Sequence, residues 1–123
     1  MSAKHESAIG HVTGRAVYTD EQREPRGLDT LYPVQALHAH AQLLARAGAA
    51  ARAMPGVLAV LTAADIPGEN DTGPIRHDEP LIAADTIAYW GQPVAWVVAT
   101  DEARANSAAA QVEARYEPLP ACL

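Results

Sequence analysis

Two histidines one residue apart offer the most direct route to chemistry in this chain of 123 residues. His38 and His40 flank Ala39, and residues two apart on a strand share a face. Both imidazoles could then reach one zinc ion, but such a site needs further ligands. The remaining histidines lack the spacing of a metal motif: His5, His11 and His77. A turn or interface pair is therefore the expected role of His38 and His40, and a small metal-dependent enzyme is the alternative.

A base and two carboxylates stand together in His77-Asp78-Glu79, just before Pro80. Adjacent carboxylates point in different directions in an extended chain, so they make a poor acid–base pair by themselves. We expect this segment to anchor its loop or to contact a neighbouring domain. A solvated surface and a catalytic role remain as alternatives.

Nucleophiles are scarce in the sequence. Cys122 is the only cysteine, and its neighbours supply neither a base nor positive charge. No serine lies in a nucleophile elbow: Ser2, Ser7 and Ser107. A lone thiol without a signal peptide fits a reducing compartment, so a cytoplasmic location is predicted. We expect no catalytic, cofactor-binding or metal-binding residue in this chain.

Gly91-Gln92-Pro93 reads as a tight turn between two strands. The expected structure is a hairpin; the alternative function is that the Gln92 amide, presented at the tip, hydrogen-bonds a neighbouring domain. Trp90 and Trp96 fall in the apolar strands on either side, which favours core or interface packing over ligand stacking.

Hydrophobic periodicity predicts the elements that position these residues. Strands are expected over residues 11–18, 28–38, 41–47, 57–61, 86–90, 93–99 and 112–116. Pro33 cannot donate a ladder hydrogen bond, so its strand belongs at a sheet edge or a bulge. The continuously apolar strand 93–99 is expected to be covered on both faces.

Helical structure is predicted mainly over residues 101–111, capped by Thr100 or Asp101. Short helical turns are expected over residues 49–54 and at Thr62–Asp65, and Met54-Pro55-Gly56-Val57 predicts a type II turn. Residues 66–80 form the longest segment without periodicity, and long loops in small domains are usually functional. The mixture of hairpin-like and crossover connections predicts the α+β class, with a flexible tail over residues 1–10 and a single domain over 11–123.

Composition limits the possible partners. The net charge of −6 and the scattered basic residues argue against nucleic acid, and no apolar run is long enough to span a membrane. Apolar residues make up 49% of the chain, but alanine dominates and phenylalanine is absent, so the core is expected to be modest. Self-association of the isolated chain is expected if its apolar surface is normally covered by neighbours.

Several short motifs together carry a resemblance to a known family. In order along the chain they are His11-Val12-Thr13-Gly14-Arg15-Ala16 with Tyr18 and Asp20, His38-Ala39-His40-Ala41, Pro55-Gly56-Val57, Thr62 to Gly68, His77 to Leu81, Gly91 to Ala95, and Val112 to Pro120. The chain resembles the N-terminal α/β-hammerhead domain of the molybdopterin-binding subunit of xanthine dehydrogenases and aldehyde oxidases. The resemblance covers about residues 8–123.

The resemblance implies a mixed, mostly antiparallel sheet and a structural role. In that family the loops around molybdenum lie in later domains, so this segment is expected to scaffold the cofactor domains and to be inactive alone. The parent enzyme would hydroxylate purines or aldehydes using molybdopterin, iron–sulphur clusters and FAD held by other segments or subunits. Interdomain contacts are expected from a small group: His77, Asp78, Glu79, Gln92 and Pro93. A free-standing binding or adaptor protein is the alternative.

Overall fold

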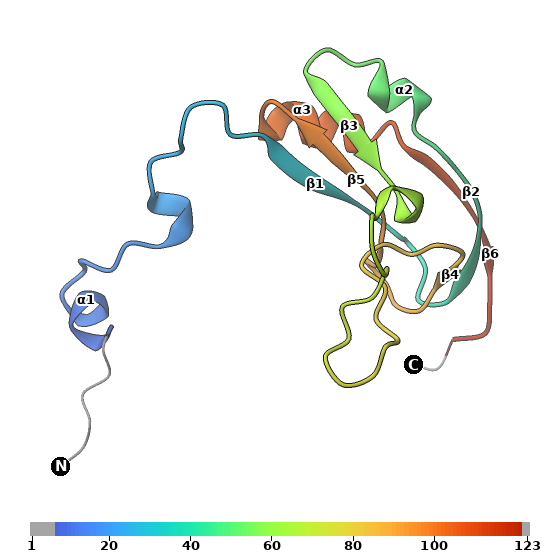
Figure 1. Cartoon of the computed structure of the whole chain (residues 1–123), viewed down its shortest axis with the longest axis horizontal. Coiled ribbons are helices and arrows are strands. Elements are labelled where there is room, and N and C mark those ends of the chain that lie inside the picture. Colours follow the sequence, from blue (N-terminus) through green and yellow to red (C-terminus); the bar gives the residue numbers. More distant parts are fainter. Residues whose placement is uncertain (1–6, 122–123) are drawn as a thin grey trace.

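The computed structural model describes residues 7–121 (Figure 1). Two three-stranded sheets form the body, and the N-terminal segment extends away from it. The elements are α1 (Ala8–Val12), a 3-10 turn (Thr19–Glu21), β1 (Thr30–Gln35), β2 (Ala41–Ala47), α2 (Ala49–Arg52), β3 (Val57–Leu61), a 3-10 turn (Ala63–Asp65), β4 (Thr86–Ile87), β5 (Pro93–Ala99), α3 (Glu102–Ala109) and β6 (Glu113–Pro118). The predicted α+β class is confirmed. Among the described residues, no helix has the length and hydrophobicity to cross a membrane.

The first sheet has the strand order β1-β5-β3, and both of its ladders are antiparallel. Pro33 lies opposite Trp96, with β1 at the edge of the sheet. The missing N–H of proline therefore costs this sheet little, and the edge position predicted for its strand is confirmed. The predicted turn before β3 is also present, since the Val57 N–H donates to the Met54 carbonyl at 3.2 Å.

Helix α3 covers one face of the first sheet (Figure 1). Asp101 caps the helix, because its Oδ1 accepts a hydrogen bond from the Arg104 N–H at 2.9 Å. Small side chains fill the interface between helix and sheet: Ala51, Ala95, Ala108 and Ala109, with Val60 and Val97. These alanines allow the helix and the strands to approach closely, and the helix predicted over residues 101–111 is present as α3.

The opposite face of the same sheet is open. Trp96 and Val98 alternate with the buried residues of β5 and are only partly buried, and Leu31 on β1 is 51% exposed. The prediction that strand 93–99 is covered on both faces is therefore wrong for this chain. A continuous apolar pattern indicates two apolar faces, but it does not say that one chain covers both.

The second sheet has the order β4-β2-β6 and a separate core. Its buried residues are Ala36, Ala41, Leu43, Ala83, Ile87 and Val94. Strand β6 is present where a strand over residues 112–116 was predicted, and its Ala114 and Tyr116 face this core. Val34 packs against both cores and so joins the two sheets.

Arg46 on β2 makes a second connection between the sheets. Its guanidinium donates to the carbonyls of Ala83 and Val94 at 2.8 Å each and of Ala84 at 2.6 Å. Three convergent backbone acceptors match the fork of donors on arginine, which lysine lacks. Arg46 therefore connects β2 in one sheet to β5 in the other.

The segment 86–93 differs from the prediction. Strand β4 ends at Ile87, and β4 and β5 belong to different sheets, so Gly91 and Gln92 do not form a hairpin tip. The side chain of Gln92 supplies the reason, because its Oε1 accepts the Ala88 N–H at 2.7 Å and replaces a ladder partner. The main chain of this turn instead pairs with Ala36, whose N–H donates to the Gln92 carbonyl at 2.9 Å.

The N-terminal segment also departs from the prediction, because residues 11–18 form no strand. Helix α1 ends at Val12, and Gly14 just beyond it has a φ of 68°, while the Arg15 N–H donates to the Gly10 carbonyl at 2.8 Å. A glycine in this left-handed conformation is a common helix terminator, so Gly14 marks a helix end and not an interrupted strand. Of the tail predicted over residues 1–10, residues 8–10 lie in α1; residues 1–6 and Cys122 lie outside the described residues.

Candidate functional site

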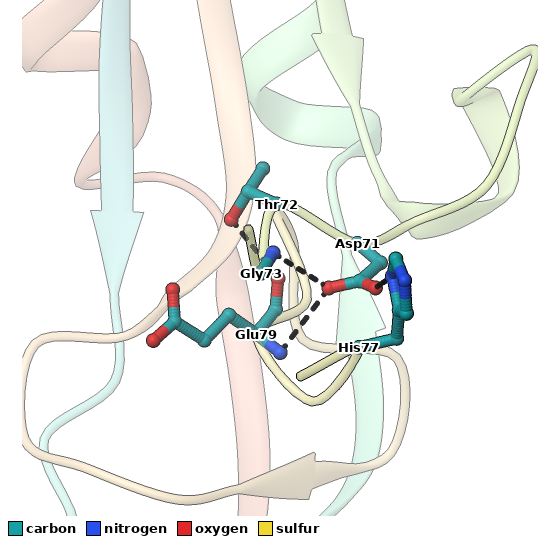
Figure 2. A network of polar contacts seen from close by, with 5 residues as sticks. All are labelled: Asp71, Thr72, Gly73, His77 and Glu79. Atoms are coloured by element: carbon teal, nitrogen blue, oxygen red, sulfur yellow. Dashed lines mark hydrogen bonds and ion pairs between the residues drawn. The ribbon is translucent and has the colours of Figure 1, made fainter. Parts of the chain in front are cut away.

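The loop of residues 66–80 contains neither helix nor strand, as predicted, yet it has a defined polar core (Figure 2). Asp71 is its centre. The Asp71 Oδ1 accepts the N–H groups of Gly73 at 2.8 Å and Glu79 at 3.3 Å, and Oδ2 contacts His77 Nδ1 at 2.5 Å. One carboxylate thus ties the two ends of the hook-shaped segment 71–79 together.

The electrostatics of this hook favour the charged form of Asp71. The Gly73 N–H lowers the pKa of the Asp71 carboxyl most, and burial opposes it as the next largest effect. His77 and the Glu79 N–H lower the pKa further, each by a smaller amount. The pKa therefore lies below its usual value, and Asp71 remains an acceptor at neutral pH. Its role is to fix the loop and not to transfer protons.

Further contacts close the base of the loop. Asn70 Nδ2 donates to the Ile82 carbonyl at 2.7 Å, while the Ile82 N–H donates to Asn70 Oδ1 at 3.1 Å. Inside the hook, a Cβ at Gly73 would lie 1.8 Å from the Arg76 carbonyl oxygen, so only glycine fits this position. The loop is long but its backbone is constrained at both ends.

An open hollow of about 460 Å³ lies between this loop and the turn before β5. Asp78, Glu79 and Gln92 line it together with Tyr89, so the structure brings three of the predicted contact residues to one place. His77 lies on the exposed side of the hook, and Pro93 begins β5 opposite Gln35.

Gln92 does not have the environment that the sequence suggested. Its side chain is 1% exposed and its Oε1 is engaged by the Ala88 N–H. The alternative of an amide presented at an exposed tip is therefore wrong. Buried in this way, Gln92 shapes the turn that carries Tyr89 and Trp90, both of which are exposed.

The two neighbouring histidines have separate protein partners. The His38 ring lies 4.9 Å from the Tyr116 ring, while His40 Nδ1 lies 2.7 Å from the Pro120 carbonyl oxygen. Across residues 7–121, no group of three or more His, Cys, Asp or Glu side chains is arranged to hold a metal ion. Both histidines therefore have structural contacts in this domain.

The hook has little capacity for catalysis. An Asp–His pair can activate a nucleophile, but the hydroxyl within the hook, that of Thr72, donates to the Glu79 carbonyl at 3.0 Å. Asp78 and Glu79 are exposed carboxylates. What the arrangement offers is a rigid, acidic, solvent-exposed loop beside a hollow, which suits contact with another surface.

A second feature was missed by the sequence reasoning. A groove of about 280 Å³ on the open face of the first sheet is lined mainly by apolar side chains: Leu31, Leu61, Ile66, Pro67, Leu81 and Trp96. We call it the apolar groove. The signal that could have revealed it was the continuous apolar pattern of β5 in a chain too short to cover both faces.

Comparison with known proteins identifies the family. Residues 13–120 match the family "Aldehyde oxidase and xanthine dehydrogenase, a/b hammerhead domain". Xanthine dehydrogenase 1 of Arabidopsis thaliana is 41% identical over 130 residues, an alignment that covers 99% of this chain and 9% of that protein.

Solved structures agree. The aldehyde oxidoreductase of Desulfovibrio gigas matches with a TM-score of 0.81 and 32% identity, over 94% of this chain and 14% of that one. A Cu,Mo-CO dehydrogenase matches with a TM-score of 0.80 and 35% identity, over 96% and 15%. The chain thus spans about a tenth of the curated relatives that it matches. It belongs to the a/b hammerhead domain family of aldehyde oxidases and xanthine dehydrogenases.

Proposed function

We propose that this chain is the hammerhead domain of a cytoplasmic, xanthine dehydrogenase-like molybdenum hydroxylase, in which it scaffolds the cofactor domains. The observation that carries the proposal is the family match over residues 13–120, combined with coverage of only 9% of a xanthine dehydrogenase. The parent enzyme would hydroxylate a purine or an aldehyde oxidatively. A free-standing adaptor is not favoured, because these relatives contain the domain within much longer chains.

The residues of this chain do not fit the cofactors of such an enzyme. A cysteine-ligated iron–sulphur cluster needs several thiolates, whereas the sequence contains one cysteine. The described residues also lack a cluster of metal ligands. We therefore assign molybdopterin, the iron–sulphur clusters and FAD to other segments or subunits, and we derive no chemical step from this chain.

The hook and the neighbouring turn are the proposed contact with the molybdopterin-binding domains. His77, Asp78 and Glu79 are exposed on a backbone that Asp71 holds fixed, so docking would cost little ordering entropy. Gln92 and Pro93 contribute indirectly, by setting the turn that forms the other wall of the hollow. Such a scaffold would offer its neighbours a contact surface that is already ordered before they bind.

Charge reversal in the complete hydroxylase tests this contact. Asp78→Arg with Glu79→Arg should lower the molybdenum content several-fold and weaken assembly, because the hook would present the wrong charge to its partner. The matched control, Glu113→Arg with Glu117→Arg, changes the same charge at exposed positions of β6. Metal analysis and size-exclusion chromatography provide the measurements. Equal molybdenum content and equal assembly of both variants would contradict the proposed contact.

A further inference from the structure

We infer that the apolar groove is a second docking surface, which receives an apolar segment of the molybdopterin-binding part of the hydroxylase. This inference rests on the proposed function and adds to it a surface distinct from the acidic hook. The groove lies on the face of the first sheet opposite α3, between Trp96 of β5 and the two ends of the 66–80 loop.

The side chains that line the apolar groove indicate which kind of ligand it can bind. The polar side chains of the groove are Thr62 and Asp65, and they bond to each other, with Thr62 Oγ1 donating to Asp65 Oδ2 at 2.8 Å. The Thr62 N–H donates to the same carboxylate oxygen at 2.7 Å. With its carboxylate already engaged, the groove has little to offer an ion, a phosphate or a sugar, so an apolar side chain is the matching ligand.

The size of the groove agrees with this assignment. Its volume of about 280 Å³ is at the lower limit for a small-molecule site. Leu31 and Leu81 on its rim are 51% and 47% exposed, so a cover would remove much leucine surface from water. Buried apolar anchors of this kind supply most of the free energy of a protein interface.

Three observations favour the rest of the hydroxylase over a second copy of this chain. The chain matches only 9% of a xanthine dehydrogenase, so most of such a protein lies outside this sequence. Ile66 and Pro67 begin the loop that carries the hook and Leu81 directly follows it, so the groove lies at the base of that loop. Two copies, by contrast, would bring together two chains of net charge −6.

Hydroxyl-radical footprinting with mass spectrometry tests the inference on native protein. The purified hydroxylase is compared with the free chain. Leu31, Leu81 and Trp96 should oxidise at least fivefold more slowly in the hydroxylase. Leu58, which is 55% exposed on β3 but lies outside the groove lining, is the internal control and should remain reactive.

The outcomes separate the inference from the proposed function. Equal oxidation of the groove residues in both samples would overturn the docking surface while leaving the scaffold role intact. A molybdenum hydroxylase purified without this sequence would overturn the proposed function itself. Protection that appears in the free chain as its concentration rises, with no protection in the hydroxylase, would assign the groove to a second copy and overturn the inference.

Substitution provides an independent check. Leu31→Ser with Leu81→Ser should reduce the yield of assembled hydroxylase at least tenfold, whereas Leu58→Ser should leave it unchanged. Thermal unfolding of the free chain shows whether a lower yield comes from lost docking or from lost folding. All three leucines are about half exposed in the free chain, so both variants should change its unfolding midpoint only slightly. Equal hydroxylase yields from the two variants would contradict a role for the groove.

Discussion

The two faces of the β1-β5-β3 sheet use the same strands but end in different surroundings. On one face, small alanines meet α3 and the apolar surface is closed within the chain. On the other, Leu31 and Trp96 are larger and remain partly exposed around a groove. The contrast shows that β5 serves folding with one set of side chains and, in our proposal, assembly with the other. Stability and assembly should therefore respond to different substitutions.

The largest expected effect comes from a charge on the covered face. Val97 is fully buried against α3, so Val97→Asp places an unpaired carboxylate in the core and should remove more than about 3 kcal/mol of stability. Leu31→Asp on the open face should cost less than about 1 kcal/mol, because that side chain already contacts water. Denaturant unfolding measures both. Similar losses for the two variants would show that the open face is part of the folding core.

The next effect concerns the connection between the sheets. Arg46→Met keeps the aliphatic stem but leaves the carbonyls of Ala83, Ala84 and Val94 without this donor, and should cost about 2 kcal/mol. Arg46→Lys should recover only part of that loss, because an ammonium does not reproduce the fork of donors. Urea unfolding of the three proteins is the measurement, and full recovery by lysine would contradict the proposed geometry.

A smaller and local effect is expected in the loop of residues 66–80, whose ends border the open face of the first sheet. Gly73→Ala should disorder the hook, since its Cβ would collide with the Arg76 carbonyl oxygen at 1.8 Å. Gly68→Ala in the same loop is the control, because no other group lies within 4 Å of the point that its Cβ would occupy and its backbone is not left-handed. Amide hydrogen exchange should accelerate across residues 71–79 in the first variant alone. Unchanged exchange would mean that the hook is not held as described.

The smallest effect is a response of the hook to acid. The folded pKa of Asp71 is lowered, so its contribution is fully present above the usual carboxylate pKa and is lost as the pH falls through the lowered value. Hydrogen exchange of the Gly73 and Glu79 amides, corrected for the intrinsic pH dependence, should therefore show lost protection only below about pH 4. Asp71→Asn should show weakened protection at neutral pH. A loss centred near neutrality would contradict control by this carboxylate.

Sequence reasoning recovered the parts of the fold that local rules decide. A cap at Thr100 or Asp101 predicted the start of α3, and Pro33 predicted a strand at a sheet edge or a bulge. It failed where a side-chain hydrogen bond to the backbone of another segment or of a turn decides the structure. The Ala88 N–H is taken by a Gln92 side chain, which ends β4 early, and Arg46 finds its acceptors on other segments. Neither pairing leaves a pattern in the chain.

In the candidate site, too, some features could be predicted from the local sequence and others could not. The residues 66–80 were correctly predicted to form a loop, because proline and glycine punctuate them. The role of Asp71 as their organiser was not predicted, since its partners are backbone N–H groups that every loop possesses. The apolar groove was missed because alternation assigns residues to faces of a strand, whereas only the structure shows which face is left open.

The most direct test of the central claim, a scaffold without catalytic residues, is turnover per bound molybdenum atom in the complete hydroxylase. The variant to use combines His77→Ala, Asp78→Ala and Glu79→Ala, which removes the exposed imidazole and the two exposed carboxylates of the hook, with xanthine and an aldehyde as substrates. We predict lower molybdenum content but turnover per molybdenum atom within about twofold of the unmodified enzyme. Normal molybdenum content with a loss of turnover of about a hundredfold, the size expected for a lost acid–base group, would contradict the account.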